Sequence, residues 1–463
     1  MSEAANSTPF SAQVQSIRDY HGTLDTQNLS WRKDQLRALQ KMLQENKSAF
    51  LDALYKDLRT NPTEGNLLQL SLVSSEITHA LKHVGGWSKP EKVSTPLYMK
   101  PSSAQIVHEP LGTALIIGAW NYPLLLTLSP LVGCIAAGNA AIIKPSEMAP
   151  ATSALLAEML PRYLDKKAFQ VIEGGIPETT DLLKEKFDTI FFTGSAPVGR
   201  IIMEAAAKNL TPVTLELGGQ CPAIVDRSAD LKLAALRIVF AKFSNAGQTC
   251  VAPNHVFVHK DVADEFTKIL KQTITDFYST DPQKSPDYGR IINQHHHTRI
   301  VALMKDQNIA CGGKSDVDDL YIAPTVLTNV DPASPVMQEE IFGPVLPLVT
   351  VNDLSEAFNH ISKNNHPLAA YVFAKDKKVI QRAEKITAGA VGINNAMLHL
   401  GVHDLPFGGV GGSGFGQYHG KAGFDLFSHA KPIFKGGSFE AGAHFPPHKE
   451  KGRIKKALLK IFL

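Results

Sequence analysis

The stretch TALIIGAWNYPLLLTLSPLVGCIAAGNAAIIKPSE, residues 113–147, carries the pattern that decides the fold. Two short apolar runs, at 114–118 and 140–143, flank a longer apolar run at 124–137. The short runs are typical of buried strands, whereas the longer run is typical of a buried helix. A strand, a helix and a second strand in this order predict two parallel strands joined by a right-handed crossover.

The same alternation of strands and helices continues along the chain. We expect further strands at 169–172, 189–192 and 213–217, and helices from Pro150, at 180–184 and at 198–208. A second series begins near Cys250, with strands at 256–258, 370–373 and 391–393. The first hundred residues have helical periodicity and should pack outside the sheet. The pattern predicts an α/β protein with a doubly wound parallel sheet, the architecture of nucleotide-binding domains, and a second α/β domain.

The composition is that of an ordinary globular protein. Of the 463 residues, 44% are hydrophobic and 20% are charged, and this length suits about two or three domains. Lys and Arg number 47 against 44 Asp and Glu, so a net charge of +3 argues against a nucleic-acid partner. The four cysteines lack metal-ligand spacing, so no metal site is expected, and their scarcity suits a reducing compartment.

No targeting or membrane-spanning segment is evident in the sequence. The first ten residues lack the basic and apolar regions of a secretory signal. The apolar stretch at 122–143 approaches the length of about 20 residues that spans a bilayer. Prolines and glycines interrupt it, so we interpret it as a buried helix, a turn and a buried strand. A cytoplasmic location is therefore expected.

Several candidate binding residues follow the predicted strands. In a doubly wound sheet, ligands bind beyond the carboxyl ends of the strands. Lys144 and Glu147 follow one strand and are suited to ribose hydroxyls. Gly194, followed by Ser195, Val198 and Gly199 at the start of a helix, would let backbone N–H groups approach a pyrophosphate. The segment lacks the GxGxxG fingerprint, so ordinary turn and packing glycines are the alternative.

Glu216 and Cys250 are the candidates for acid–base and nucleophilic chemistry. Glu216 lies at the end of an apolar strand, where desolvation should raise its pKa and suit it to general-base catalysis. Cys250 follows a small polar turn, Gly247-Gln-Thr, rather than lying inside an apolar run. The alternative for any cysteine is an inert buried side chain, and Cys134, Cys221 and Cys311 keep that interpretation.

Over essentially its whole length, the chain resembles the aldehyde dehydrogenase superfamily. The matching segments are Glu216-Leu-Gly-Gly, Gly247-Gln-Thr-Cys, Lys144-Pro-Ser-Glu, Phe192-Thr-Gly-Ser and Glu339-Glu-Ile-Phe-Gly-Pro. Leu405-Pro-Phe-Gly-Gly and Tyr418-His-Gly-Lys resemble the class 3 branch, which includes fatty, aromatic and coniferyl-type aldehyde dehydrogenases. Seven motifs in the order of the family make the resemblance specific.

The resemblance implies an organisation in four parts. Residues 1–217 would be the helical N-terminal segment with the dinucleotide-binding domain, and 218–400 the catalytic domain. Residues 401–435 would return to the cofactor domain and supply the oligomerisation strand, for which 424–434 is the candidate. The last part, 436–463, would be a basic tail. Class 3 relatives are dimers, so a homodimer is expected.

The resemblance also implies roles for particular residues. Cys250 would attack the aldehyde, and the Asn121 amide and the Cys250 N–H would form an oxyanion hole. Hydride would then leave for the nicotinamide, and Glu216 would activate water to hydrolyse the thioester. Glu340 and Phe342 would contact the nicotinamide ribose. Trp120 and Tyr122 would form walls of the substrate tunnel. Medium- or long-chain aliphatic or aromatic aldehydes are the expected substrates.

The acidic Glu147 near the adenosine ribose should repel a 2′-phosphate, so NAD is the expected cofactor. Because class 3 relatives often accept both cofactors, NADP is a possible second.

The C-terminal tail suggests a surface-binding role. Residues 449–463 hold six Lys and Arg against one Glu, a charge of 6 − 1 = +5. On a helix, Ile454, Leu458, Ile461 and Phe462 would cluster on one side, and Arg453, Lys456 and Lys460 on another. Such a helix can lie on an anionic membrane. A solvated terminus and a segment that packs on a partner subunit are the alternatives.

Two rival functions remain at this stage. An acylating relative would pass the thioester to coenzyme A and would not need a water-activating base, so Glu216 argues against it. A binding protein that kept the fold without turnover would be expected to lose Cys250, Asn121 or Glu216, and this chain keeps all three.

Overall fold

The computed structural model describes residues 8–96, 99–363 and 366–437, and the predicted α/β fold is confirmed there. The N-terminal residues form the expected helices. Their apolar faces, which include Leu36, Leu39, Phe50 and Leu54, are buried. These helices are α1 (Ser11–Gly22), α2 (Leu29–Glu45), α3 (Lys47–Leu58), α4 (Pro62–Gly65) and α5 (Ser71–Trp87), with the π-helical turn η3 (Asn66–Leu70) before α5.

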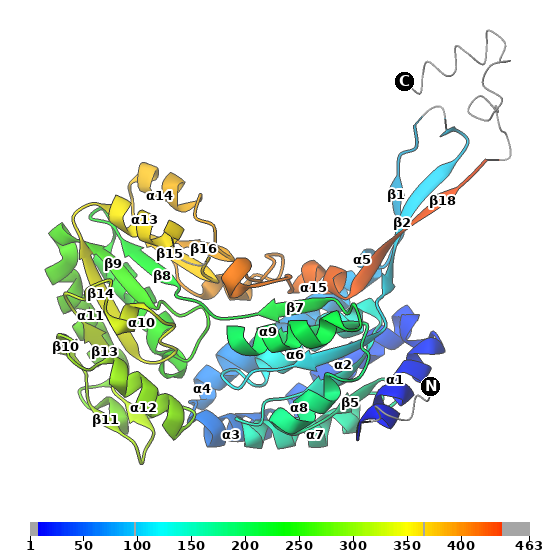
Figure 1. The fold of residues 1–463 in the computed structure, drawn as a ribbon, viewed down its shortest axis with the longest axis horizontal. Coiled ribbons are helices and arrows are strands. Elements are labelled where there is room, and N and C mark those ends of the chain that lie inside the picture. Colours follow the sequence, from blue (N-terminus) through cyan, green and yellow to red (C-terminus); the bar gives the residue numbers. More distant parts are fainter. Residues whose placement is uncertain (1–7, 97–98, 364–365, 438–463) are drawn as a thin grey trace, which may run out of the picture.

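The first sheet has the strand order β17-β7-β6-β3-β4-β5 among the described residues (Figure 1). All its pairs are parallel except β17 with β7. Every residue of β3, β4 and β6 is buried, so the centre of the sheet is covered on both faces. The strands are β3 (Thr113–Ile117), β4 (Ala140–Lys144), β5 (Phe169–Val171), β6 (Thr189–Thr193), β7 (Val213–Glu216) and β17 (Gly414–Phe415).

The connecting helices follow the prediction with one shift. They are α6 (Leu125–Ala137), α7 (Pro150–Tyr163), α8 (Ile176–Leu182) and α9 (Ala196–Ala207). The prediction that 180–184 lies in a short helix is confirmed for 180–182, but α8 begins earlier, directly after Gly175, and ends at Leu182. The Glu178 side chain accepts a hydrogen bond from the Gly175 N–H at 2.7 Å, which caps this start.

The second sheet has the order β10-β13-β14-β9-β8-β15-β16 in the part of the chain that the structure describes. Its pairs are parallel except β10 with β13. The strands are β8 (Pro222–Val225), β9 (His255–His259), β10 (Ile309–Cys311), β13 (Thr325–Leu327), β14 (Val345–Val351), β15 (Ala369–Phe373) and β16 (Ala390–Ile393), and β11 (Ser315–Asp316) pairs separately with β12 (Tyr321–Ile322). The helices are α10 (Leu231–Phe243), α11 (Ala263–Tyr278), α12 (Gln294–Leu303), α13 (Leu354–Lys363) and α14 (Lys377–Ala383).

The sequence did not predict β8, because its four buried residues are too few to show a period. The second sheet therefore begins with β8, which precedes Cys250 in the chain, whereas its predicted start was near Cys250. The domain boundary after residue 217 stays a prediction. The strands on either side are consistent with it, since β7 ends at Glu216 and β8 begins at Pro222.

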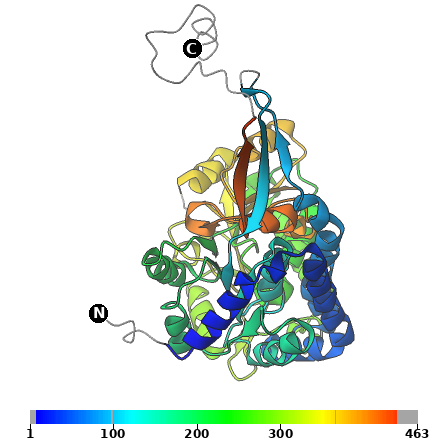
Figure 2. The same cartoon turned by 90° about the vertical axis from the view of Figure 1, so that its right-hand side faces the viewer.

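Three antiparallel strands form an arm that projects from the body of the molecule (Figures 1 and 2). They are β1 (Glu91–Val93), β2 (Ser103–Pro110) and β18 (Ser428–Lys435), with β2 in the middle. The prediction of a strand over 424–434 was wrong in its first residues, because α15 (Gly420–Leu426) continues to Leu426.

Gly133 of α6 lies against the backbone of Gly423 in α15, which leaves no room for a larger residue at position 133.

Within the described ranges, no helix has both the length and the apolar character that crossing a bilayer requires. The same part of the chain contains no group of three or more His, Cys, Asp or Glu side chains that could hold a metal ion.

Candidate active site

A tight left-handed turn precedes Cys250. After α10 the chain enters the turn η5 (Ser244–Gly247), where Asn245, Ala246 and Gly247 have φ angles of 49°, 50° and 76°. A Cβ at Gly247 would collide with the Gly343 carbonyl, so this position requires glycine. The Gln248 side chain then fixes the loop by donating to the Asn245 and Arg290 carbonyls at 3.0 and 2.9 Å. The loop that carries Cys250 is therefore held rigidly from both sides.

The structure brings Asn121 and Tyr122 to this loop from the end of β3. The Asn121 Nδ2 donates to the Gln248 carbonyl at 3.1 Å, and the Asn245 Nδ2 donates to the Asn121 carbonyl at 2.7 Å. The Tyr122 hydroxyl lies 2.8 Å from the Thr249 Oγ1. A side-chain amide has two N–H donors, and the second N–H of Asn121 has no partner among the described residues. It is therefore free to bind a substrate oxygen.

Glu216 is buried at the end of β7 without a hydrogen-bond partner. Neither carboxylate oxygen has a partner among the residues that the structure describes. This burial raises the pKa of Glu216 well above its usual value, as the sequence predicted. Burial also raises the pKa of the Cys250 thiol, and Glu340, Cys221 and Glu216 raise it further. The thiol therefore stays protonated at neutral pH until a base removes the proton.

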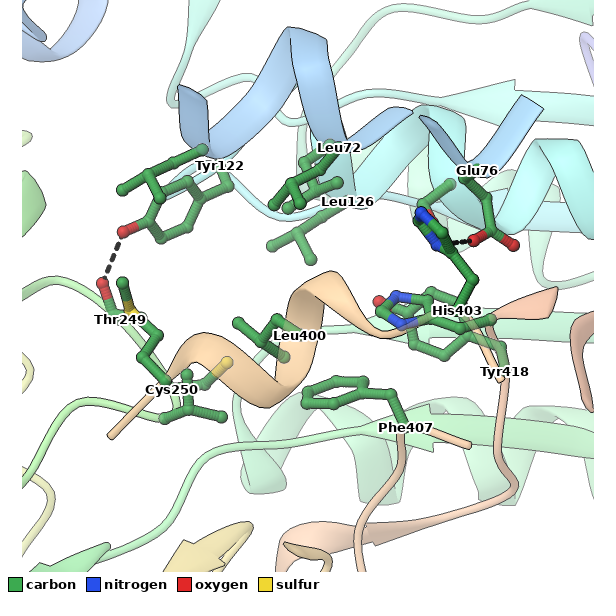
Figure 3. Close-up of a pocket in the computed structure, with 16 residues that line it drawn as sticks. Leu72, Glu76, Tyr122, Leu126, Thr249, Cys250, Leu400, His403, Phe407 and Tyr418 are labelled. Atoms are coloured by element: carbon green, nitrogen blue, oxygen red, sulfur yellow. Dashed lines mark hydrogen bonds and ion pairs between the residues drawn. The ribbon is translucent and has the colours of Figure 1, made fainter. Parts of the chain in front are cut away.

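An apolar cavity opens beside Cys250. The space measures about 630 Å³ when its open, solvent-facing part is included. Figure 3 shows Tyr122, Thr249 and Cys250 at one end, with Leu72, Leu126 and Leu400 along its length. Tyr122 thus lies where the sequence predicted. Trp120 was also predicted to form a wall of the substrate tunnel, but it is not among the residues that line this cavity. Its ring instead packs against Phe342 and His296, with centroids 5.3 and 5.2 Å away.

The predicted ribose residues lie together at the end of β4. The Lys144 Nζ donates to the Glu147 carboxylate at 3.0 Å and to the Pro145 carbonyl at 2.9 Å. Lys144 is buried, whereas the Glu147 side chain is about half exposed. Because Lys144 pairs with Glu147, it partly neutralises the acidic charge on which the expected NAD preference rests.

Gly194 and Ser195 lie at the end of β6, directly before α9, and Val198 and Gly199 lie in the first turns of α9. A Cβ at Gly194 would collide with the Phe192 ring, and one at Gly199 would lie 3.1 Å from Leu217. Both glycines therefore have a packing role, which is the alternative that the sequence left open. The Ser195 side chain makes no capping bond, so the first N–H groups of α9 are not satisfied by this residue.

Glu340 lies close to the carboxyl end of β7. Its carboxylate occupies the space beside Gly218 that a Cβ would fill. One of its oxygens is buried without a hydrogen-bond partner in the described ranges, and burial raises the pKa of Glu340 to about 7. The following segment turns sharply, because Phe342 has a φ of 48°. The structure thus brings Glu340 and Phe342 to the side of the site that holds Trp120 and Gly218.

Glu64, which the sequence did not predict as a site residue, lies on α4 and supports the loop that carries Cys250. Glu64 Oε1 accepts a hydrogen bond from the Asn245 N–H at 2.7 Å, at the first residue of the left-handed turn. Burial raises the pKa of Glu64 to about 7. Nearby, the Arg290 N–H donates to the Leu58 carbonyl at 3.0 Å. The corner between α3 and α4 thus contacts both segments that fix Gln248. The sequence around Glu64 contains no motif that predicts its contact with Asn245, because the two residues are far apart along the chain.

We expect Glu64→Ala to slow the reaction of Cys250 by about ten- to a hundredfold, because the loop loses the bond that fixes its first residue. Glu64→Gln keeps an acceptor for the Asn245 N–H and should restore most of the rate. The rate of Cys250 alkylation by iodoacetamide measures this, with Glu158→Gln on the exposed face of α7 as control. Equal alkylation of Glu64→Ala and the unaltered protein would contradict the positioning role.

Comparisons with known proteins identify the family of this chain. Residues 2–433 match the profile of the aldehyde dehydrogenase family. The 4,4'-diaponeurosporen-aldehyde dehydrogenase of Staphylococcus aureus is 45% identical over 95% of this chain and 97% of its own length. The dimeric NADP-preferring aldehyde dehydrogenase of Mus musculus is 47% identical over 91% of this chain and 93% of its own. A solved structure of the substrate-bound state of Staphylococcus aureus AldH has a TM-score of 0.95 at 43% identity, covering 98% of this chain and 100% of that one.

Proposed function

Because this chain belongs to the aldehyde dehydrogenase family, we propose that it oxidises medium- or long-chain aliphatic or aromatic aldehydes to carboxylates, through a thioester on Cys250. The observation that carries the substrate class is the apolar cavity that ends at Cys250. Five leucines are among its lining residues, and an alkyl chain or an aromatic ring would be desolvated there at little cost. The name of the Staphylococcus aureus relative, which acts on a diaponeurosporen aldehyde, supports an apolar substrate.

The first chemical role belongs to Cys250. Its Sγ would attack the aldehyde carbon and form a thiohemiacetal, while the thiol proton leaves to a base. The carbonyl oxygen gains negative charge in this step. The free N–H of Asn121 and the backbone N–H of Cys250 would stabilise that charge. Asn121 is suited to this because its other N–H is already fixed on the Gln248 carbonyl, so the amide needs no reorganisation.

Glu216 would act as the general base for hydrolysis. A carboxylate without hydrogen-bond partners and with a raised pKa has the basicity to take a proton from water. The hydroxide so formed would attack the thioester carbon, and the Cys250 thiolate would leave. The carboxylate product and the free thiol complete the cycle. A coenzyme A transfer enzyme would not need this base, so the presence of Glu216 favours hydrolysis.

The residues around the cofactor site suit a nicotinamide dinucleotide. When bound, this group accepts the hydride from the thiohemiacetal carbon. We propose that Lys144 and Glu147 hold the adenine ribose, and that Gly194, Ser195, Val198 and Gly199 flank the pyrophosphate at the start of α9. Glu340 has a buried oxygen without a partner in the described residues, as a ligand for ribose hydroxyls requires. Phe342 would pack beside the nicotinamide, with Trp120 behind it.

Both NAD and NADP are proposed as cofactors. The negative charge of Glu147 favours NAD, but its ion pair with Lys144 weakens the repulsion of a 2′-phosphate. The name of the mouse relative, which is NADP-preferring, also supports NADP.

We propose that two copies associate through the arm. β18 is an outer strand of the three-stranded sheet, so one edge of its backbone is open to pairing. Phe434 in this strand is 57% exposed, as suits a residue covered by a partner. The mouse relative is named as dimeric, which supports the same assignment.

The predicted membrane-binding tail, residues 436–463, lies outside the described residues except for 436–437. On its sequence alone we propose that it contacts anionic membranes. Removing 449–463 should weaken binding to anionic vesicles and leave the oxidation of a short aldehyde intact. Each Lys or Arg near such a surface contributes about 1 kcal/mol. Co-sedimentation at low and high salt measures this, since salt screens surface charge. Equal sedimentation of both proteins would rule out membrane contact by the tail.

Decanal and coenzyme A together test the proposed reaction. When the protein is mixed with decanal and NAD or NADP, we expect the absorbance of the reduced cofactor to rise. The rate of this rise should stay the same when coenzyme A is added. Dependence of the rate on coenzyme A would favour the acylating alternative. Absence of reduction with aliphatic and aromatic aldehydes alike would contradict the substrate class.

A further inference from the structure

A close pair of side chains lies at the end of the cavity away from Cys250. Glu76 of α5 and His403, in the segment 398–404, form this pair, with the Glu76 Oε2 2.7 Å from the His403 Nδ1. We call it the Glu76–His403 clasp. Figure 3 shows the clasp at one end of the cavity and Cys250 with Thr249 at the other, and the leucines line the space between.

The clasp is held by further contacts on both sides. The second ring nitrogen of His403, Nε2, lies 2.6 Å from the Ser75 Oγ on α5. The other carboxylate oxygen of Glu76 accepts a hydrogen bond from the Gly420 N–H at 2.7 Å. Burial alone would raise the pKa of Glu76, but its contacts with His403, His419 and the Gly420 N–H hold this pKa below its usual value. The Glu76 carboxylate is therefore charged at neutral pH.

The two elements that the clasp joins carry opposite walls of the cavity. Leu72 lies on α5, whereas Met397 and Leu400 lie on or directly before the segment 398–404. The clasp thus fixes how far apart these walls stand. The clasp lies near the protein surface, because the side chain of Asp404, next to His403, is 86% exposed. An alkyl chain that reaches the clasp must either stop there or push its two side chains apart, which is costly because the buried Glu76 carboxylate would lose its contact with His403.

We propose that the Glu76–His403 clasp determines the longest aldehyde that this enzyme accepts. Alkyl chains that end before the clasp fit between it and Cys250, and longer chains are rejected because they would have to break it. This inference rests on the proposed function, since it concerns the same cavity and the same reaction. It assigns Glu76 and His403 to substrate selection and gives them no part in the chemistry at Cys250.

Chain-length profiles of matched variants test the clasp. The double variant Glu76→Gln/His403→Ala removes it without leaving a buried carboxylate unpaired. His403→Gln weakens it but keeps a polar side chain. Asp404→Asn is the control, because it removes the neighbouring contact with His79, 3.5 Å long, and leaves the clasp intact. The kcat/KM of each protein is measured on saturated aldehydes from butanal to hexadecanal, with kcat and KM determined separately.

The ratio of kcat/KM for hexadecanal to that for butanal should rise about tenfold in the double variant, mainly through a lower KM for the long chain. His403→Gln should show a smaller rise, and Asp404→Asn should keep the original ratio. An unchanged ratio in the double variant overturns the proposal. If the double variant does not fold, as judged by circular dichroism, an unchanged ratio in His403→Gln overturns it instead.

The same data separate this inference from the proposed function. An unaltered enzyme that oxidises none of these aldehydes contradicts the aliphatic substrate class, and the clasp fails with it. An unaltered enzyme that oxidises them, with variants that share its profile at every length, leaves the proposed function standing and overturns the clasp alone.

Discussion

Replacing Cys250 with alanine should abolish the oxidation of decanal, with a loss of more than about 10⁴-fold in kcat. The reason is that no thiohemiacetal can form without the Sγ, and no other group on the left-handed loop can replace it. The cofactor should still bind, because the residues proposed to hold it, Lys144, Glu340 and the start of α9, do not depend on the Cys250 side chain. Reduced-cofactor absorbance measures the loss, and quenching of protein fluorescence measures binding.

The matched control is Cys311→Ala. Cys311 is also a free, partly exposed thiol, but it lies on β10 at an edge of the second sheet and does not line the cavity. Its variant should keep full turnover. Substantial oxidation by Cys250→Ala would show that the nucleophile lies elsewhere or that no covalent intermediate forms.

Replacing Glu216 with glutamine should separate the two halves of the reaction. One equivalent of reduced cofactor should still appear in a burst, because hydride leaves before the thioester is hydrolysed. Steady turnover should fall by about 10²- to 10⁴-fold, since the amide cannot take a proton from water. Rapid-mixing absorbance resolves the two phases. Normal steady turnover would exclude Glu216 as the base, and a lost burst would show that its main role precedes hydride transfer.

The same variant should be more stable than the unaltered protein at neutral and alkaline pH. The pKa of Glu216 in the folded protein lies well above its usual value, so the folded state disfavours the charged form. The stability associated with this group is fully present at low pH and is lost as the pH rises through the raised pKa. Glutamine does not titrate. The difference in Tm between the two proteins should therefore grow with pH, which also shows that lost turnover is not due to unfolding.

The candidate residues at the strand ends could be predicted because local sequence places them. Short apolar runs give the strands, and in a doubly wound sheet ligands bind beyond the carboxyl ends of the strands, so Lys144 and Gly194 were expected there, whereas the role of Asn121 follows from the family resemblance. Glu216 was expected to be desolvated because apolar residues surround it in the sequence, and its buried carboxylate agrees. Each of these inferences uses only a few neighbouring residues.

The residues that support and shape the site could not be predicted in this way. Glu64 contacts Asn245, and Glu76 contacts His403. The partners in each pair are so far apart in the sequence that hydrophobic periodicity cannot predict their contact. The helical pattern of α5 predicts that Glu76 lies on a helix but not which loop faces it. Trp120 precedes Asn121 directly, yet the strand end turns and directs its ring to Phe342, away from the cavity. Such contacts depend on how distant segments pack.

The most direct test of the account is the mass of the protein after one turnover. Glu216→Gln is mixed with decanal and the oxidised cofactor, quenched in acid and digested, and the peptides are analysed by mass spectrometry. We expect a decanoyl group on the peptide that contains Cys250 and an unmodified peptide at Cys311. Absence of any acyl group after a measured burst, or its presence on another residue, would contradict the claim that the aldehyde is oxidised as a thioester on Cys250.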